Sequence, residues 1–318
     1  MFPTGLSMLW EATEPRSALK ERFGLASFDE AGRWLAKVLA EAWAIDVQVC
    51  DRIIISGDNA IAWVRTNRGT LVAKWSRAQD QFLKFAATAD LIQALHKKGV
   101  PVAPPLPSLD GQNRVIRGSF SIVVQPHIDG ELLDTTTDTA VRRAGVCLAR
   151  LHGALARQRD DRLTELGRHT GGSLDLRRRI ETWLEHEDTG SAPAASARLR
   201  DQVGSLPPID SEPQLIHNDY RASNVLTSDS EIVAVLDFDE VALDYCVSDL
   251  ANAFVLLGTR FTHWQPTSTR VRDALLDGYQ SVRTLTGLEH QWLHALVLLR
   301  GIQAIPPGDD PAGWANAV

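Results

Sequence analysis

The chain has 318 residues, 44% of them hydrophobic and 23% charged, which is typical of a soluble protein with two domains or one bilobal unit. No apolar run approaches the ~18–20 residues that span a bilayer, and the first residues lack a signal-peptide pattern. The three cysteines are widely spaced and form no disulfide framework or metal motif. We therefore expect a cytoplasmic protein without a membrane partner.

The net charge of −7 is distributed unevenly along the chain. Residues 1–130 carry 15 Lys and Arg against 13 Asp and Glu, a balance of +2, whereas residues 131–318 carry 18 against 27, a balance of −9. An acidic surface argues against nucleic acid as a partner, because binding to a phosphate backbone requires basic residues. The excess of acidic residues in the second half would suit a cationic small molecule as a ligand. The alternative is that these residues serve only to keep the protein soluble.

The first part of the chain predicts helices followed by a sheet. Ser27 and Glu30 have the spacing of a capping box that opens an amphipathic helix. A further helix is expected at about 78–97, ending before Gly99. Five short runs rich in β-forming residues surround it: 46–56, 60–66, 70–76, 112–117 and 120–126. Together they predict a small, mostly antiparallel five-stranded sheet with one inserted helix.

From about residue 127 the hydrophobic period becomes mainly helical. Helices are expected at 140–155, 247–258, 268–285 and 289–303. Three short strands interrupt this pattern, and the last two form a hairpin through Ser228, Asp229 and Ser230: 214–217, 224–227 and 231–238. The predicted architecture is therefore α+β, with a sheet-rich unit at 1–126 and a mainly helical unit at 127–318.

The hairpin is flanked by polar residues in the segments LIHNDYRASN and LDFDE. Because a hairpin returns the chain to its start, Asn224 and Asp237 should lie together at one end of it. A carboxylate and a carboxamide are hard oxygen ligands of the kind that Mg²⁺ prefers when it faces a triphosphate. Asp219, on the loop just before, would then face the acceptor, where phosphoryl transfer needs a carboxylate to take the hydroxyl proton.

These two segments resemble the catalytic loop and metal motif of the aminoglycoside phosphotransferase and choline kinase superfamily. Members of this superfamily are small-molecule kinases with a bilobal, protein-kinase-like fold. Further segments resemble those of the family in the same order, over about residues 46–260: SGDNAIAWVRT, LVAKW, GVPVAPP, VVQPHIDG, LARLH and SDLANAF. The resemblance implies a nucleotide-binding N-lobe built on the sheet and a helical C-lobe that carries the catalytic hairpin.

The resemblance also implies a role for the residues of the loop and hairpin. Asp219 would be the catalytic base, and Asn224 and Asp237 would hold Mg²⁺. His217 would position the loop through hydrogen bonds rather than react. Arg221 stands where protein kinases carry a loop lysine, so it either contacts the γ-phosphate or is simply solvated.

For the nucleotide, which is ATP or GTP, the resemblance implies a second set of residues. Lys74 would reach the α- and β-phosphates from the third strand, although an edge-strand lysine that discourages aggregation has the same appearance. The other expected contacts come from the turn after the first of the five strands and from the segment that links the lobes: Gly57, Asn59, Gln125, His127 and Ile128.

Two features depart from the family pattern. The family places a Glu on the first-lobe helix to pair with the strand lysine, but that place falls near Thr88, and residues 42–130 contain no Glu. Asp80 or Asp90 could substitute, or Lys74 could pair with the phosphates alone. The turn SGDN is also poorer in glycine than a protein-kinase loop.

We therefore expect an ATP-dependent kinase that acts on a hydroxyl of a small molecule, as a monomer or homodimer. The acidic residues Asp239, Glu240 and Asp244 favour a cationic acceptor, such as an aminoglycoside, peptide antibiotic or macrolide, or an amino alcohol or amino acid. One alternative is a protein Ser/Thr kinase, but the segment 239–247 is short for a regulated activation loop. Another is a pseudokinase-like nucleotide-binding scaffold, which the missing Glu supports.

Overall fold

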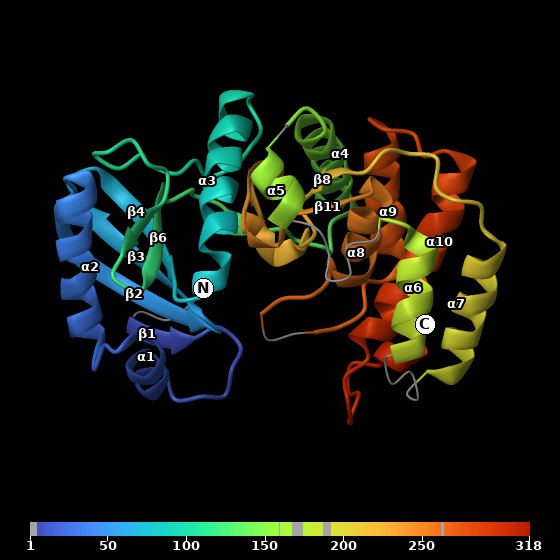
Figure 1. Ribbon diagram of the computed structural model, residues 1–318, viewed down its shortest axis with the longest axis horizontal. Coiled ribbons are helices and arrows are strands. Elements are labelled where there is room, and N and C mark those ends of the chain that lie inside the picture. Colours follow the sequence, from blue (N-terminus) through green and yellow to red (C-terminus); the bar gives the residue numbers. More distant parts are fainter. Residues whose placement is uncertain (1–4, 159, 167–173, 187–191, 262–263) are drawn as a thin grey trace. The chain divides into compact units, whose positions relative to one another are not determined.

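The structure is a computed structural model that describes residues 5–158, 160–166, 174–186, 192–261 and 264–318 (Figure 1). The chain divides into two compact units, Met1–Asp129 and Gly130–Val318. The predicted boundary between residues 126 and 127 lies close to this division. Each unit has its own secondary structure and core, so each is described separately.

The first unit is built on a six-stranded sheet in the order β1-β2-β3-β4-β6-β5. Its strands are β1 (Gly5–Met8), β2 (Val47–Ser56), β3 (Asn59–Thr66), β4 (Gly69–Ser76), β5 (Val115–Arg117) and β6 (Phe120–Pro126). All five predicted strands are present and pair antiparallel with one another. The sixth strand, β1, pairs parallel with β2 and was not predicted, because a four-residue run shows no clear alternation.

Three α-helices accompany this sheet (Figure 1): α1 (Pro15–Phe23), α2 (Phe28–Trp43) and α3 (Phe82–Lys97). Ser27 caps α2 by accepting from the backbone N of Glu30 at 3.2 Å, as predicted. The Glu30 carboxylate accepts from Ala26 N, one residue before the expected partner. One face of α2 packs with the sheet in a single apolar core that includes Trp43 and Trp75.

The second unit is mainly helical, as expected. Its helices are α4 (Asp138–Leu155), α5 (Asp161–Leu166), α6 (Leu176–His186), α7 (Pro193–Ser205), α8 (Cys246–Leu256), α9 (Thr269–Gln280) and α10 (Gly287–Ala304). Two small sheets complete it, in the orders β10-β9-β7 and β11-β8. Their strands are β7 (Glu131–Leu132), β8 (Gln214–Ile216), β9 (Val225–Ser228), β10 (Glu231–Val235) and β11 (Ala242–Asp244).

The strands β9 and β10 form the predicted hairpin. Ser228 pairs with Glu231, so the turn consists of Asp229 and Ser230, which have φ angles of 49° and 66°. This left-handed pair matches the right-handed twist of the strands, as in common two-residue hairpins. At the other end of the ladder Val235 pairs with Val225, which brings the chain beyond β10 back to the end of the preceding loop.

Two glycines let α4 and α9 approach each other closely. A Cβ on Gly145 would come within 2.1 Å of Leu275 O, and one on Gly278 within 1.9 Å of Arg142 O. Such distances leave no room for any side chain, so the backbones themselves are in contact there. This crossing fixes α9 against α4, and both helices carry residues that support the site described below.

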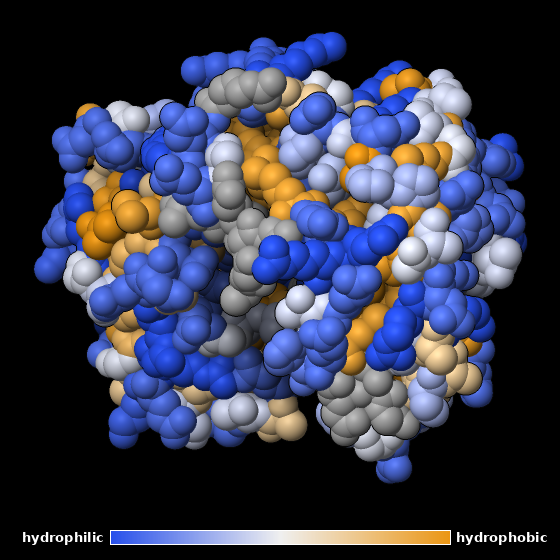
Figure 2. Space-filling view, turned by 45° about the vertical axis from the view of Figure 1, so that its right-hand side comes forward, coloured by the Kyte–Doolittle hydropathy of each residue, from blue (hydrophilic) through white to orange (hydrophobic). Residues whose placement is uncertain are grey.

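The face of the molecule in Figure 2 is mostly polar. Hydrophilic residues cover most of the face in Figure 2, with apolar residues visible between them. None of the helices in the described part of the chain combines the length and the apolar character needed to cross a membrane.

Candidate active site

The predicted catalytic loop joins β8 to β9 in the second unit, and α8 holds its backbone. The buried carboxylate of Asp249 accepts from the backbone N of His217 at 2.9 Å and of Asn218 at 2.8 Å. Asn218 has a φ of 65°, in the left-handed region, and Asn252 donates to its Oδ1 at 2.7 Å. Since unpaired backbone groups are costly when buried, these bonds define the conformation of the loop.

A buried chain of side chains extends this support from α8 to α4 and α9. His152 Nε2 on α4 lies 3.0 Å from the Asp249 carboxylate, and its Nδ1 lies 2.8 Å from the hydroxyl of Tyr279 on α9. His152 and Asp249 are 1% and 0% exposed, so the pair is closed to solvent. The motif segments LARLH and SDLANAF therefore meet in space to hold the loop.

His217 is positioned to hold the loop rather than to react. Its Nδ1 accepts from Asp219 N at 3.2 Å, which requires that this nitrogen carry no proton. Its Nε2 therefore carries the proton and donates to Leu236 O at 3.0 Å. Burial lowers the pKa of His217, which favours this neutral form. The ring thus links the loop to the end of β10.

Asp219 lies in the same loop and is half-buried. Asn224 Nδ2 donates to its backbone O at 2.9 Å and to its Oδ2 at 2.7 Å, and Arg221 Nη2 lies 3.0 Å from the same Oδ2. Burial raises the pKa of Asp219 to about 7; Arg221 and Asn224 oppose the rise, and the charges of Asp237 and Glu240 add to it. A carboxyl with a pKa near neutrality is suited to general-base work.

Asn224 and Asp237 meet at the end of the hairpin, as the sequence predicted. Asn224 O accepts from Leu236 N at 2.8 Å, and the charge of Asp237 reaches Asp219 strongly enough to affect its pKa. Because the amide nitrogen of Asn224 donates to Asp219, its amide oxygen is left as an acceptor. That oxygen and the exposed carboxylate of Asp237 are both hard oxygen donors, the type of ligand that Mg²⁺ prefers, so the two residues could hold this ion.

The predicted nucleotide turn belongs to the first unit and is tightly anchored. Ser56 pairs with Asn59, so Gly57 and Asp58 form a two-residue turn. Gly57 N donates to the carboxylate of Glu11 at 2.7 Å, and Arg22 binds both that carboxylate and Gly57 O. The backbone N–H of Gly57 is thus already engaged within the unit. Nothing in the sequence pattern pointed to Glu11, because it lies far from the turn along the chain.

Lys74 lies on the third of the predicted strands, and helix α3 follows that strand along the chain, as the sequence predicted. Lys74 lies on β4 between Ile61 of β3 and Val123 of β6. Thr88, at the place of the missing Glu, is buried in α3, and its hydroxyl has no hydrogen-bond partner among the described residues. Asp90, a candidate substitute, accepts from Asn113 Nδ2 at 3.0 Å. Asp80, the other candidate, accepts from Gln81 beside it.

The predicted adenine contacts begin at the end of β6. The side chain of Gln125 donates to Ala103 O at 2.6 Å, and His127 N donates to Thr70 O at 3.1 Å. Ile128 follows outside the strand and is half-buried. The backbone therefore leaves the sheet at His127 and Ile128. The predicted backbone contacts with the edge of the adenine base would be made there.

One acidic residue expected near the acceptor faces elsewhere. Asp244 is fully buried and paired with Arg179 of α6 at 2.9 Å, and it also accepts from Tyr245 N. Its charge is therefore neutralised inside the unit, and its expected role toward an acceptor is wrong. Asp239 and Glu240 lie in the short 3-10 helix η3 (Phe238–Glu240) directly after Asp237. Glu240 is exposed there, and Asp239 is half-buried.

The model of a family described as "Phosphotransferase enzyme family" matches residues 53–291. Among curated proteins, Acyl-CoA dehydrogenase family member 11 from Gallus gallus is 29% identical over 192 residues, and its Mus musculus counterpart is 26% identical over 189 residues. The matched parts are 56% and 55% of this chain but 23% of each relative, so the chain spans less than a quarter of their length.

Solved structures show the same fold at low sequence identity. A complex of an amicoumacin kinase with AMP-PNP and Ca²⁺ has a TM-score of 0.63 and 16% identity, over 95% of this chain and 92% of that one. A microcompartment-associated aminopropanol kinase has a TM-score of 0.61 and 18% identity, over 90% and 92%. A macrolide 2′-phosphotransferase from Brachybacterium faecium has a TM-score of 0.61 and 19% identity, over 85% and 90%.

Proposed function

Because the chain belongs to the phosphotransferase enzyme family, we propose that it is an ATP-dependent kinase whose acceptor is a hydroxyl of a small cationic molecule. The observation that carries this proposal is the arrangement of Asp219, Asn224 and Asp237. The half-buried carboxylate of Asp219, with a pKa of about 7, lies beside Asn224, and the β9–β10 pairing brings Asp237 to the same end of the hairpin. Such a site supplies a base and a metal position together, as phosphoryl transfer requires.

In the proposed reaction, the acceptor oxygen attacks the γ-phosphorus of ATP while its proton passes to Asp219. The bond between the γ-phosphorus and the β,γ-bridging oxygen breaks, so the products are ADP, the phosphorylated acceptor and a proton that Asp219 later releases. Arg221, held 3.0 Å from Asp219, places positive charge beside the transferring group. The hydrogen bonds from Asp249 keep the base in place for this step.

The remaining predicted residues would hold the nucleotide. Asn224 and Asp237 would bind Mg²⁺, which neutralises phosphate charge when bound. Lys74 would hold the α- and β-phosphates. The adenine edge would meet the backbone at His127 and Ile128, and the turn at Gly57 would cover the phosphates, with GTP as an alternative donor.

The proposed acceptor class rests on charge near the base. The charges of Asp237 and Glu240 both raise the pKa of Asp219, so these carboxylates lie near it. The second unit as a whole has a balance of −9. One structural neighbour acts on aminopropanol, whose name states an amine and an alcohol. The positive charge of an amino alcohol or of an amine-bearing antibiotic would complement these carboxylates.

The two alternatives have less support. A protein kinase would need an activation segment after Asp237, but that segment forms η3 and then β11, which pairs with β8. A scaffold that does not turn over substrate would not need Asp219, Asn224 and Asp237, and all three are present. The buried Thr88 in place of a helix Glu is the feature that favours the scaffold.

The decisive experiment is a thermal-shift titration with Mg·ATP, followed by an ATP-consumption screen. The screen covers aminoglycosides, macrolides, amicoumacin, choline, aminopropanol and homoserine, together with a hydroxyacyl-CoA because of the curated relatives' name. We expect stabilisation that needs both ATP and Mg²⁺ and is lost in Asp237→Ala. Asp219→Asn should keep that stabilisation and lose turnover by about 10²–10⁴-fold.

A matched control lies at the other end of the same hairpin. Asp229→Asn removes a carboxylate of equal size from the β9–β10 turn, where Asn tolerates the left-handed backbone. It should bind and turn over like the wild type. No stabilisation of the wild type at millimolar ATP would end the kinase proposal, and normal turnover by Asp219→Asn would end the assignment of the base.

A further inference from the structure

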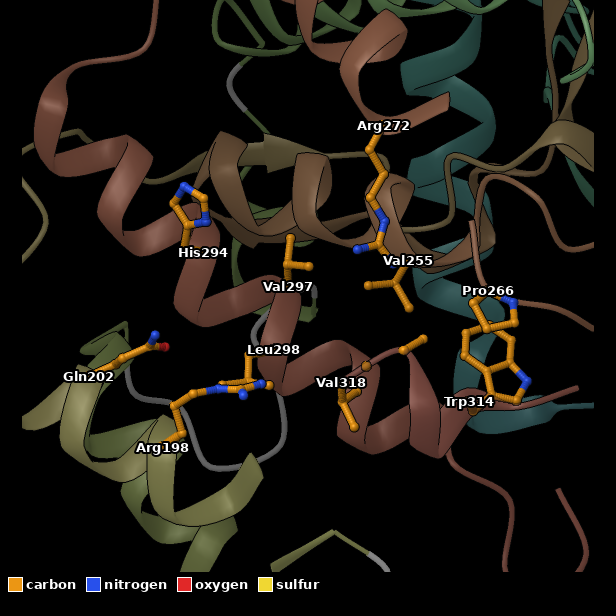
Figure 3. Close-up of a pocket in the computed structure, with 12 residues that line it drawn as sticks. Arg198, Gln202, Val255, Pro266, Arg272, His294, Val297, Leu298, Trp314 and Val318 are labelled. Atoms are coloured by element: carbon orange, nitrogen blue, oxygen red, sulfur yellow. The ribbon is translucent and has the colours of Figure 1, made fainter. Parts of the chain in front are cut away.

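A cavity of about 220 Å³ lies in the second unit among residues that have no place in the proposed reaction (Figure 3). Its walls come from α7, α8, α9, α10 and the segment 314–318. This volume corresponds to about seven water molecules, which is enough for a small organic molecule. None of its lining residues belongs to the catalytic loop or the β9–β10 hairpin.

The side chains that line the cavity include basic residues but no acidic ones, and the only negative group among the 12 lining residues is the main-chain carboxylate of Val318. Arg198 of α7, Arg272 of α9 and His294 of α10 contribute side chains, whereas none of the 12 lining residues is an Asp or a Glu. The second unit as a whole carries 18 Lys and Arg against 27 Asp and Glu. The charged side chains of the lining are therefore positive, whereas those of the second unit as a whole are mostly negative. This local positive charge favours the binding of an anion.

Arg272 is the basic residue placed deepest in the wall. Its Nε donates to Phe254 O at 3.0 Å, which fixes the guanidinium, and its terminal nitrogens point into the cavity between Val255 and Val297 (Figure 3). It forms no ion pair with any residue that the structure describes. Burial lowers the pKa of Arg272, because a half-buried cation without a carboxylate partner is poorly solvated. An anion in the cavity would supply that missing partner.

The rest of the lining would take an apolar body. Val255, Val297, Leu298 and Trp314 line the cavity together with the arginines. The side-chain oxygen of Gln202 is buried and has no hydrogen-bond partner within the described part of the chain. A buried polar atom without a partner is costly, so a polar group on a bound molecule would stabilise it. The lining thus combines positive charge, one amide and several apolar side chains.

We propose that this cavity binds a small amphipathic anion, a carboxylate or phosphate monoester joined to a flat apolar group. Arg272 holds the anionic group, Arg198 adds positive charge to the lining, and Trp314 with the aliphatic lining residues holds the apolar group. The lining includes no residue of the catalytic loop or of the β9–β10 hairpin, so the site differs from the proposed base and metal position. Its existence does not depend on the proposed function.

The test uses benzoate and phenyl phosphate as probes on the full chain. Binding is followed by the ¹H–¹⁵N indole signal of Trp314, which the variant Trp314→Phe identifies. We expect benzoate or phenyl phosphate to bind with a dissociation constant of about 1 mM or lower. Benzamide, which has the shape of benzoate without its charge, should bind at least ~10-fold more weakly, and added salt should weaken only the anions. Whichever anion binds tighter shows which group the site prefers.

Arg272→Gln should weaken binding of the anion by about 10-fold or more while binding of benzamide stays unchanged. Arg270→Gln is the matched control, because Arg270 lies on the same helix, pairs with Asp138 and does not line the cavity. If circular dichroism shows that Arg272→Gln is unfolded, Arg198→Gln replaces it, because Arg198 is exposed. This variant should also weaken binding of the anion, by a smaller factor, and leave binding of benzamide unchanged. The proposal is overturned if the anions bind no better than benzamide, or if the arginine variants and the control behave alike.

Discussion

At the scale of single residues, the central feature is a carboxyl that the fold keeps close to neutrality. Asp219 is half-buried beside Asn224 and Arg221, and its pKa is raised to about 7. The loop around it could not be moved without breaking bonds to Asp249 and His217. The fold therefore holds the proposed base in one place, although burial makes its charge unfavourable.

The first prediction concerns the pH dependence of turnover. A base must be ionised to accept a proton, and Asp219 loses its charge as the pH falls through about 7. We expect kcat/KM to fall by about tenfold per pH unit on the acid side of that value. Initial rates between pH 5.5 and 9 at saturating Mg·ATP would measure this, and a rate that stays level down to pH 5 would contradict it.

The second prediction concerns stability. The pKa of Asp219 is higher in the folded chain than its ordinary value of 3.8, so the folded state binds the proton more tightly. The free energy of unfolding should therefore decrease as the pH rises from about 4 to about 7. Asp219→Asn cannot ionise, so it should gain stability relative to the wild type at pH 8, by about 2 kcal/mol or less, and little at pH 4. Thermal melts at both values check this; an equal difference at the two would refute it.

At the scale of elements, packing between helices decides where the supports of the loop lie. His152 on α4 and Tyr279 on α9 meet because Gly145 and Gly278 allow the two helices to touch. The sequence shows the amphipathic faces of both helices, but it does not show that the contact is made backbone to backbone. Close approach of this kind depends on the absence of a Cβ at both positions.

The third prediction tests that contact. Gly145→Ala would place a Cβ within 2.1 Å of Leu275 O, so the helices must separate, and we expect a loss of about 2–4 kcal/mol. Gly153→Ala on the same helix meets nothing within 4 Å and should stabilise the chain by about 0.5–1 kcal/mol. Urea unfolding of both variants gives the comparison. Equal effects of the two substitutions would show that the close crossing is not required.

The fourth prediction concerns the β2–β3 turn. Removing the carboxylate in Glu11→Ala takes away the partner of Gly57 N, so exchange of that amide hydrogen should accelerate by about tenfold. Glu14→Ala removes a different carboxylate, which caps α1 by accepting from Arg16 N and Ser17 N. It should affect only the amides of α1. Hydrogen exchange read by NMR distinguishes the two, and an unchanged Gly57 amide in Glu11→Ala would contradict the assignment.

At the scale of the whole molecule, charge is divided between the two units. The unit that carries the six-stranded sheet has a balance of +2, and the unit that carries Asp219 has a balance of −9. A negative balance raises the local concentration of cations and lowers that of anions. The proposed phosphate donor is an anion, so Lys74 and the Mg²⁺ that Asn224 and Asp237 would hold would have to offset this field, whereas a cationic acceptor would benefit from it.

The fifth prediction follows from that balance. We expect the KM for a cationic acceptor to rise several-fold between about 0.05 and 0.5 M NaCl, because screening shortens the reach of the acidic field. A neutral acceptor of similar size should show little change. Steady-state kinetics at fixed Mg·ATP would measure both, and an equal salt effect on the two acceptors would argue against electrostatic selection of the acceptor.

The sequence by itself determined the order of the elements and the loop-and-hairpin group. Asp219, Asn224 and Asp237 are close in the chain, and hydrophobic period and turn residues are local properties that place them at one end of a hairpin. The same reasoning placed the strands β2 to β6 and the main helices. It failed for β1, whose pairing with β2 is formed only in the folded sheet.

Only the tertiary structure decided which distant residues support that group. Glu11 reaches the turn at Gly57, and Arg179 neutralises Asp244, across separations along the chain that carry no periodic signal. The raised pKa of Asp219 has the same origin, since it comes from burial by the folded chain and not from its neighbours in sequence. Local pattern specifies elements, whereas burial and long-range pairing depend on how all of them pack.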